Sequence, residues 1–206
     1  MRPAPITSLL AGAAGAAGAF VLLAAAVARH DLKRLDKTVR DSVPDARTTK
    51  GKTAADVVGP IGKEWLLLPV AVGVTGYLWH RGAGAASFVP VVAAATAAGA
   101  NLLFEEHLDI QHPPPGHPKR REPSFPSGHA LQTTAVGLTT AYVLAREAEV
   151  NSGPAFAAAA FLSVLSPAGR VYLDRHWLSD VVGGWLAGLA AAALSSAAYE
   201  TLRPRS

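Results

Sequence analysis

The stretch PSFPSGH, residues 123–129, separates a proline-rich segment from a long run that contains no charged residue. Its last three residues bring a hydroxyl, a glycine and an imidazole to the start of that run. A helix that begins there offers free backbone N–H groups beside small side chains, an arrangement that binds anions. Residues 123–129 therefore predict the beginning of a helix and a place where an anion can be held.

Uncharged runs recur along the whole chain and indicate the fold class. A membrane-spanning helix needs about 20 mostly apolar residues, and a Lys, Arg or Asp at its centre costs roughly 2.5–3.5 kcal/mol on insertion scales. The sequence thus predicts an all-α polytopic membrane protein: a bundle of about six transmembrane helices in a single domain over residues 1–206. A soluble, Ala-rich helical bundle is the alternative. The runs are 3–28, 65–80 (which residues 57–61 can extend), 82–104, 123–145, 150–169 and 181–199.

The composition of the chain excludes some kinds of site. Half of the 206 residues are apolar, 17% are charged, and cysteine is absent. A disulfide framework, a Cys-based zinc site and a cysteine nucleophile are therefore excluded. The net charge is +4, but the basic residues lie between apolar runs, so we expect them to meet lipid headgroups and not nucleic acid.

The most charged segment follows the first run. Residues 29–56 are predicted to form a helix on the membrane surface and then a polar loop over 45–52. Leu32, Leu35 and Val39 recur at helical spacing on one side of this helix, while Lys and Arg cover its other faces. A solvated linker helix without a lipid role is the alternative.

The two ends of the chain carry smaller signals. Residues 1–28 are predicted to be an uncleaved first helix, because the apolar part is longer than that of a signal peptide, which is the alternative. In the last run, Gly184 and Gly188 give a small-xxx-small face for close helix packing. Residues 200–206 are expected to form a C-terminal tail.

A second polar stretch, RVYLDRH at residues 170–176, is followed by Asp180. Helices that alternate in direction place the end of the third span, the start of the fourth, the end of the fifth and the start of the sixth on one membrane face. Residues 105–128, which contain consecutive prolines, are predicted to be an active-site loop on that face. His176 and Asp180 are four residues apart and hence share a helix face. The topology therefore gathers the polar residues.

The residue types gathered in this way suit phosphoryl transfer, which demands mostly positioning and charge stabilisation. Asp180 can hold the tautomer of His176 and stabilise the charge that this imidazole gains as a nucleophile. Arg170 offers a fork of donors that fits a phosphate. The Ser127 hydroxyl and the Gly128 N–H can bind further oxygens, since glycine permits close approach of the backbone.

His129 is left to protonate the leaving oxygen. Each of these residues also has a plainer interpretation, because a serine or glycine before a helix is usually a cap and an arginine at a membrane edge usually binds lipid headgroups. The joint pattern at matching helix ends favours a site.

These residues resemble two motifs of the type-2 phosphatidic acid phosphatase family, which shares its site with vanadium-dependent haloperoxidases. The Pro-Ser-Gly-His motif is intact at residues 126–129, and residues 170–180 match the spacing of the following motif, with Gly169 where serine is usual. The six-span layout extends the resemblance over nearly the whole chain. The roles that it implies are nucleophile (His176), general acid (His129), orienting carboxylate (Asp180) and phosphate ligands (Arg170, Ser127 and Gly128).

The first motif of that family is altered. Its lysine position is occupied by Glu105, and its Arg-Pro position by His112-Pro113. We expect both Glu105 and His112 to contact substrate in a cradle that is less positive than usual, unless His112 is protonated or one of the basic residues 119–121 folds in. A divalent ion could replace the missing charge. The metal-capable groups are Glu105, His107, Asp109, His112 and His117.

The resemblance implies a membrane-embedded phosphatase that hydrolyses a lipid phosphate or diphosphate, polyprenyl or glycerolipid, through a phosphohistidine intermediate. Its expected partners are the lipid substrate and the bilayer, with no cofactor and no obligatory metal; the oligomeric state is open. The alternatives are a catalytically weak lipid-phosphate-binding membrane protein, a metal-assisted variant that uses Glu105 and His112, and a vanadate-dependent peroxidase.

The side of the membrane is contested by two signals. The resemblance implies an active site outside the cytoplasm, in the plasma membrane. The positive-inside rule favours the cytoplasmic face instead, because residues 29–63 carry nine Lys and Arg. We expect the extracytoplasmic side, since some of these cations can serve substrate binding.

Overall fold

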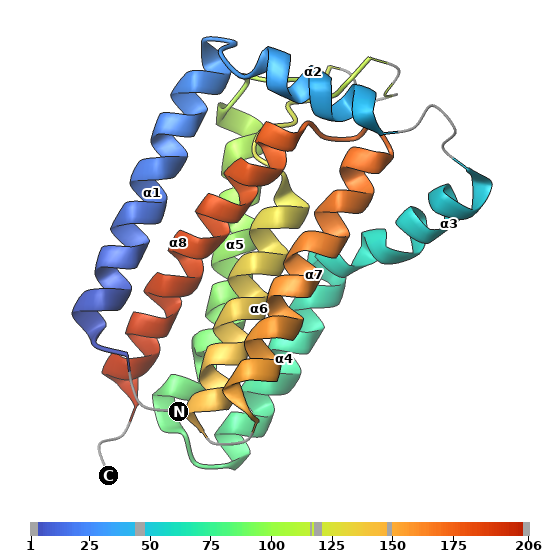
Figure 1. Cartoon of the computed structure of the whole chain (residues 1–206). Helices are drawn as coiled ribbons and strands as arrows, with labels where there is room; N and C mark the ends of the chain where they lie inside the picture. The colour runs from blue at the N-terminus through green and yellow to red at the C-terminus, as the bar shows by residue number, and fades with distance from the viewer. Residues whose placement is uncertain (1–3, 44–47, 116, 118–120, 148–149, 204–206) are drawn as a thin grey trace.

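The computed structural model describes residues 4–43, 48–115, 117, 121–147 and 150–203. Within these ranges the chain forms helices and no strand, which confirms the all-α prediction. Figure 1 shows a bundle of long helices with a short helix lying across one end. The elements are α1 (Ile6–Ala28), α2 (Lys33–Ser42), α3 (Thr49–Val58), the 3₁₀ helix η1 (Gly59–Gly62), α4 (Glu64–His80), the 3₁₀ helix η2 (Gly84–Phe88), α5 (Val89–His107), α6 (Gly128–Arg146), α7 (Ser152–Tyr172) and α8 (Leu178–Leu202).

All six predicted runs lie on these helices, but they differ in what surrounds them. Among the described residues, four segments are long and apolar enough to cross a membrane: α1, η2 with α5, α7 and α8. A fifth is added if α3 and η1 form one span with α4, to which they are joined at a bend of 48°. The remaining run is α6, which is buried along most of its length and carries Thr133, Thr134 and Thr139 inside the bundle. A helix enclosed by other helices can carry such hydroxyls, because its side chains do not face lipid.

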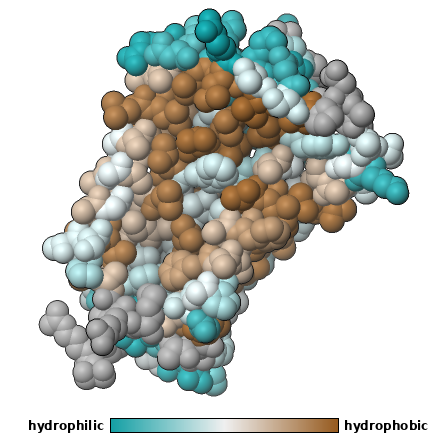
Figure 2. Space-filling model, in the orientation of Figure 1, coloured by the Kyte–Doolittle hydropathy of each residue, from teal (hydrophilic) through white to brown (hydrophobic). Residues whose placement is uncertain are grey.

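The outer surface has the pattern of a membrane protein. In Figure 2, apolar residues cover the middle of the visible face, and hydrophilic residues gather at its two ends. Large apolar side chains such as Leu22, Leu102 and Phe161 are exposed. Trp65 and Trp79 are exposed near opposite ends of α4, where interfacial anchors are expected.

Close packing of α8 on α6 joins the two polar stretches. A Cβ atom on Gly188 would lie 2.7 Å from the carbonyl oxygen of Leu131 and from the Cβ of Thr134. One on Gly184 would overlap the carbonyl oxygen of Ser127, and one on Gly183 would meet the ring of Phe125 at 2.6 Å. Only glycine lets the helices approach this closely, so the predicted packing role of the glycine pair agrees with the geometry.

Helix α2 lies across the end of the bundle where α8 begins, and the start of α1 and the end of α8 lie at the other end (Figure 1). Leu35, on the side predicted to face lipid, is 51% exposed, whereas the carboxylate residue Asp36 is buried against the start of α8 and 4% exposed. The reason is tertiary, since the start of α8 offers hydrogen-bond donors to this face of α2.

Three predicted boundaries are corrected. Helix α3 already begins at residue 49, capped by the Thr48 side chain, which accepts from the Gly51 N–H; the loop prediction is therefore wrong for residues 49–52, and residues 44–47 lie outside the described part. Helix α5 extends past Glu105, so the active-site loop begins at residue 108. Arg170 is helical, because α7 continues to Tyr172 with its arginine turned into the bundle.

Candidate functional site

The start of α8 holds an imidazole against a buried carboxylate. His176 lies in the short connection before α8, and its Nδ1 is 3.3 Å from Asp180 Oδ2. The Asp180 side chain is fully buried, whereas that of His176 is 17% exposed. The Trp177 backbone N–H also donates to Oδ2 at 2.9 Å. Because Asp180 occupies Nδ1, the other ring nitrogen of His176 is the one that can react.

The second polar stretch meets the first through the backbone. The Ser127 N–H donates to the carbonyl oxygen of Asp180 at 2.9 Å. Ser127 precedes the first residue of α6, so that Gly128 and His129 form its first turn. The structure therefore brings the predicted residues Ser127, Gly128 and His129 to the place where His176 and Asp180 lie. Their catalytic and binding roles remain predictions.

Arg170 completes this set from α7. Its Nη2 is 2.5 Å from His129 Nε2, so the imidazole accepts from the guanidinium and carries its own proton on Nδ1. The backbone of η1 passes directly behind the pair, because Cβ atoms on Gly59 and Gly62 would lie 2.9 Å from Arg170 Nη2 and 2.8 Å from His129 Cβ. Two glycines in η1 thus make room for a cation and an imidazole.

Two donors of the site have no partner among the described residues. Ser127 Oγ and Arg170 Nε are both buried without a hydrogen bond there. Leaving a buried polar group unsatisfied costs about 1–3 kcal/mol. Both groups come from the set predicted to bind phosphate, and a hydrogen bond to a bound anion would remove this cost for either of them.

A cavity of about 620 Å³ opens beside these groups. Its wall contains His129, Arg170 and His176, together with residues from the start of α4, the end of α5 and the loop before α6. The charged residues of the wall balance in number, three against three: Lys63, Arg170 and Arg175 against Glu64, Glu105 and Glu122. Lys63 and Arg175 therefore supply positive charge that the altered first motif does not.

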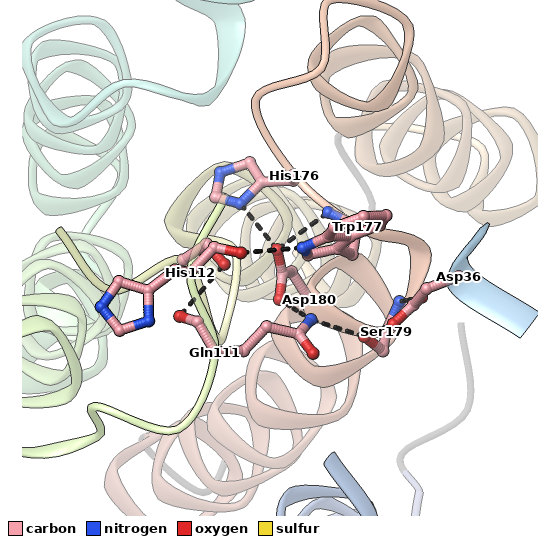
Figure 3. Close-up of polar contacts among 8 residues, drawn as sticks. Asp36, Gln111, His112, His176, Trp177, Ser179 and Asp180 are labelled. Carbon is pink, nitrogen blue, oxygen red and sulfur yellow. Dashed lines mark hydrogen bonds and ion pairs between the residues drawn. The ribbon is translucent and has the colours of Figure 1, made fainter. Parts of the chain in front are cut away.

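The two predicted residues of that altered motif, Glu105 and His112, do not lie in the same place. Glu105 lines the cavity and accepts a hydrogen bond from Asn101 Nδ2 at 2.9 Å. His112 has a half-exposed side chain that pairs with Asp109 at 3.2 Å, and it is not among the described residues of the cavity wall. Figure 3 shows its ring turned away from His176 and Asp180. Arg121 is exposed, and residues 119 and 120 lie outside the described part.

The metal hypothesis finds no cluster to support it in the described ranges. Within them, no three His, Asp or Glu side chains converge in a way that could hold a metal ion. Of the proposed donors, His117 and Glu105 reach the cavity wall.

Sequence reasoning missed three polar residues that support Asp180. Gln111 Nε2 donates to Asp180 Oδ1 at 2.7 Å and to Ser179 Oγ at 2.8 Å. Ser179 in turn donates to Asp36. Ser179 directly precedes Asp180 in the sequence, but Gln111 and Asp36 lie 69 and 143 residues from their partners on α8. No local pattern could reveal those pairings.

Comparison with known proteins agrees with this geometry. The model of the PAP2 superfamily matches residues 101–204, and no curated protein matches the chain. A solved structure with the same fold is described as the first transmembrane PAP2 type phosphatidylglycerolphosphate phosphatase from Bacillus subtilis. The likeness has a TM-score of 0.82 at 22% sequence identity, and covers 92% of this chain and 96% of that chain. Together with the apolar helices, this match confirms a polytopic membrane fold.

Proposed function

Since the chain belongs to the PAP2 superfamily, we propose that it is an integral-membrane phosphatase that hydrolyses a lipid phosphate or diphosphate through a phosphohistidine intermediate. Family membership confirms the resemblance drawn from residues 126–129 and 170–180. The observation that carries the mechanism is that His176, which is paired with the buried Asp180, lines a cavity together with Arg170. In the described part of the chain, Ser127 Oγ and Arg170 Nε have no hydrogen-bond partner.

The reaction follows from the positions of these groups. The free Nε2 of His176 attacks phosphorus, the bond to the lipid oxygen breaks, and His129 gives that oxygen a proton. Water then attacks the phosphohistidine and gives a proton back to His129, which releases phosphate and restores both histidines. Asp180 stabilises the imidazolium-like charge in both steps. Arg170, Ser127 and the Gly128 N–H hold the phosphoryl oxygens.

The contact between Arg170 and His129 means that substrate binding also changes the hydrogen bonding of His129. In the free protein, His129 Nε2 is occupied as an acceptor of the guanidinium. A phosphate that takes the Arg170 donors releases Nε2, which can then take up a proton from the bound phosphate or from solvent and pass it to the leaving oxygen. Substrate binding thus prepares the general acid.

The cavity wall bears on the substrate class. Lys63 and Arg175 extend its positive charge beyond Arg170, which supports diphosphates as well as monophosphates. Leu102 and Ala98 of α5 line the same cavity, and Leu102 is 64% exposed. An acyl or prenyl tail can lie along this face of α5 while the headgroup reaches His176.

A phosphate-release assay tests the proposal. The protein is purified in detergent and offered polyprenyl and glycerolipid phosphates and diphosphates, with and without chelator. We expect release from at least one lipid, loss of release in His176→Ala, and retention in His80→Ala, whose exposed imidazole lies at the far end of α4. Release that survives in His176→Ala would refute the mechanism. Loss with chelator would favour the metal-assisted variant.

Glu105 favours one second candidate, a lipid-phosphate-binding membrane protein with weak catalysis. Its carboxylate lines the cavity and repels an incoming phosphate. This candidate predicts that a radiolabelled lipid phosphate binds to the detergent-solubilised protein, while phosphate release stays at the level of His176→Ala.

We propose that the site faces the extracytoplasmic side of the plasma membrane. The chain has no cysteine, so single cysteines report sidedness cleanly. Arg121→Cys and Val150→Cys lie on exposed connections at opposite ends of α6. A membrane-impermeant maleimide should label the first from outside intact cells and the second only after lysis; the reverse result would place the site in the cytoplasm.

A further inference from the structure

Helix α2 contacts the segment that carries His176 on both sides of that residue. Arg40 donates to the two carboxylate oxygens of Asp174 at 3.0 and 3.2 Å. Asp36 accepts from the Ser179 N–H at 2.9 Å and from the Ser179 hydroxyl at 2.6 Å. Asp36 and Arg40 are four residues apart, so one face of α2 makes both contacts.

The contact at Asp36 continues into the site. With its hydroxyl hydrogen donated to Asp36, Ser179 Oγ can only accept from Gln111 Nε2. The same Gln111 nitrogen then donates its other hydrogen to Asp180 Oδ1, and Asp180 Oδ2 is left for His176 and the Trp177 N–H. Figure 3 shows this row of side chains running from α2 to His176.

The Asp36 carboxylate fixes the directions of the two hydrogen bonds that the Ser179 hydroxyl makes, one given to Asp36 and one received from Gln111. A carboxylate accepts only, whereas a serine hydroxyl and a glutamine amide can each reverse their roles. If Ser179 were free to donate to Gln111, the amide would turn and present its oxygen to Asp180. Two acceptors would then face each other beside a buried carboxylate.

We infer that α2 is a clamp on the catalytic segment, in which Asp36 and Arg40 are positioning residues for the His176–Asp180 pair. The inference rests on the proposed role of His176 as nucleophile. Neither residue lies in the cavity wall as described, so both act through the residues that they hold.

The burial of Asp36 supports a role beyond stability. Asp36 is 4% exposed, and no cation pairs with it among the described residues. Burial raises the pKa of Asp36, and the charge of Asp180 raises it further against the hydrogen bonds from Ser179. The charged form thus opposes folding at neutral pH. Asparagine at position 36 has the same shape and should be tolerated by the fold. Its amide can donate as well as accept, so it would no longer fix the direction of the Ser179 hydroxyl.

Asp36→Asn is the variant that tests the clamp, and Asp41→Asn on the same helix is its matched control, because Asp41 is exposed and forms an ion pair with the exposed Lys37. We expect Asp36→Asn to lower kcat about tenfold or more, the size of effect that orienting partners have elsewhere, with KM nearly unchanged. A double variant with Ser179→Ala should be no slower than Ser179→Ala alone, because Asp36 acts through Ser179.

Hydrogen exchange supplies a readout that needs no substrate. Amides of residues 174–180 should exchange about tenfold faster in Asp36→Asn and in Arg40→Ala than in wild type or Asp41→Asn. Unchanged exchange and unchanged kcat in Asp36→Asn would overturn the clamp while leaving the phosphatase intact. If the wild type releases no phosphate, the proposed function fails, and the exchange experiment still decides the clamp.

Discussion

Replacing Asp180 with asparagine perturbs the pair on which the proposed chemistry depends. The buried carboxylate takes three hydrogen bonds: from Gln111 Nε2 at 2.7 Å, from the Trp177 N–H at 2.9 Å and from His176 Nδ1 at 3.3 Å. Asparagine keeps the shape but only one acceptor oxygen. That oxygen can face Gln111 or the His176 side, and the NH₂ group must face the other.

The expected loss can be worked from these contacts. A hydrogen bond to a charged group contributes about 1.5–3 kcal/mol, which corresponds to about 10- to 150-fold in kcat. An NH₂ group opposite Nδ1 also favours the tautomer with its proton on Nε2, the atom that must attack. The same change in a serine-protease triad lowers kcat about 10⁴-fold for this reason. We therefore expect kcat to fall at least about 100-fold, with little change in KM, since Asp180 lies behind His176.

The assay follows phosphate release at saturating lipid and, in rapid-quench samples, the acid-labile phosphoenzyme. Asp180→Asn should form the phosphoenzyme slowly. Asp31→Asn, which changes an exposed aspartate paired with Arg29, should match wild type. A variant that unfolds at the normal temperature in detergent and keeps kcat within about threefold of wild type would refute the reasoning.

Three further predictions concern packing, charge and pH. Gly188→Ala should destabilise the protein by about 1–3 kcal/mol, because the new Cβ would lie 2.7 Å from backbone and side-chain atoms of α6. The control Gly99→Ala, whose new Cβ would have no atom within 4 Å, should be neutral or slightly stabilising. Equal unfolding temperatures of the two variants would contradict the close α6–α8 contact. Glu105→Gln should lower KM for a lipid phosphate about three- to tenfold by removing a like charge from the cavity wall, an effect that salt should reduce; an unchanged KM at low salt would place the phosphate far from Glu105. Burial raises the pKa of Asp36 in the folded protein above its ordinary 3.8. The stabilisation that the protonated Asp36 contributes is therefore complete below pH 3.8 and is lost as the pH rises through the higher pKa of the folded state. The unfolding temperature of wild type minus that of Asp36→Asn should therefore increase on acidification from pH 7, and a decrease would reverse the sign of the pKa shift.

Much of the fold was predictable because the membrane imposes local requirements. Uncharged runs long enough to cross a bilayer identify helices without knowledge of their neighbours. The runs did not distinguish α6 from the lipid-facing helices, since enclosure depends on what packs around a helix. They also left out α3, whose ten residues become helical beside α7 and η1.

The candidate site likewise has features that the sequence predicts and others that depend on the tertiary structure. His176 and Asp180 could be paired from their spacing, because four residues along a helix return to the same face. Ser127, His129 and Arg170 could be placed at the same membrane face by counting spans. The contact between His129 and Arg170, and the departure of His112 from the cavity, depend on side-chain directions that spacing does not contain.

By itself, then, the sequence determined a membrane bundle and the spacing of the residues that we propose bind phosphate at one end of it, because helix length and helix period act over a few neighbouring residues. Only the tertiary structure decided what completes the end of that bundle. Lys63 reaches the cavity because η1 and α4 meet at a bend, and Asp36 reaches Ser179 across 143 residues of chain. Such contacts arise from packing between distant segments. The residues of PSFPSGH and the His176–Asp180 pair could therefore be named from sequence, but not the carboxylate on α2 that contacts Ser179.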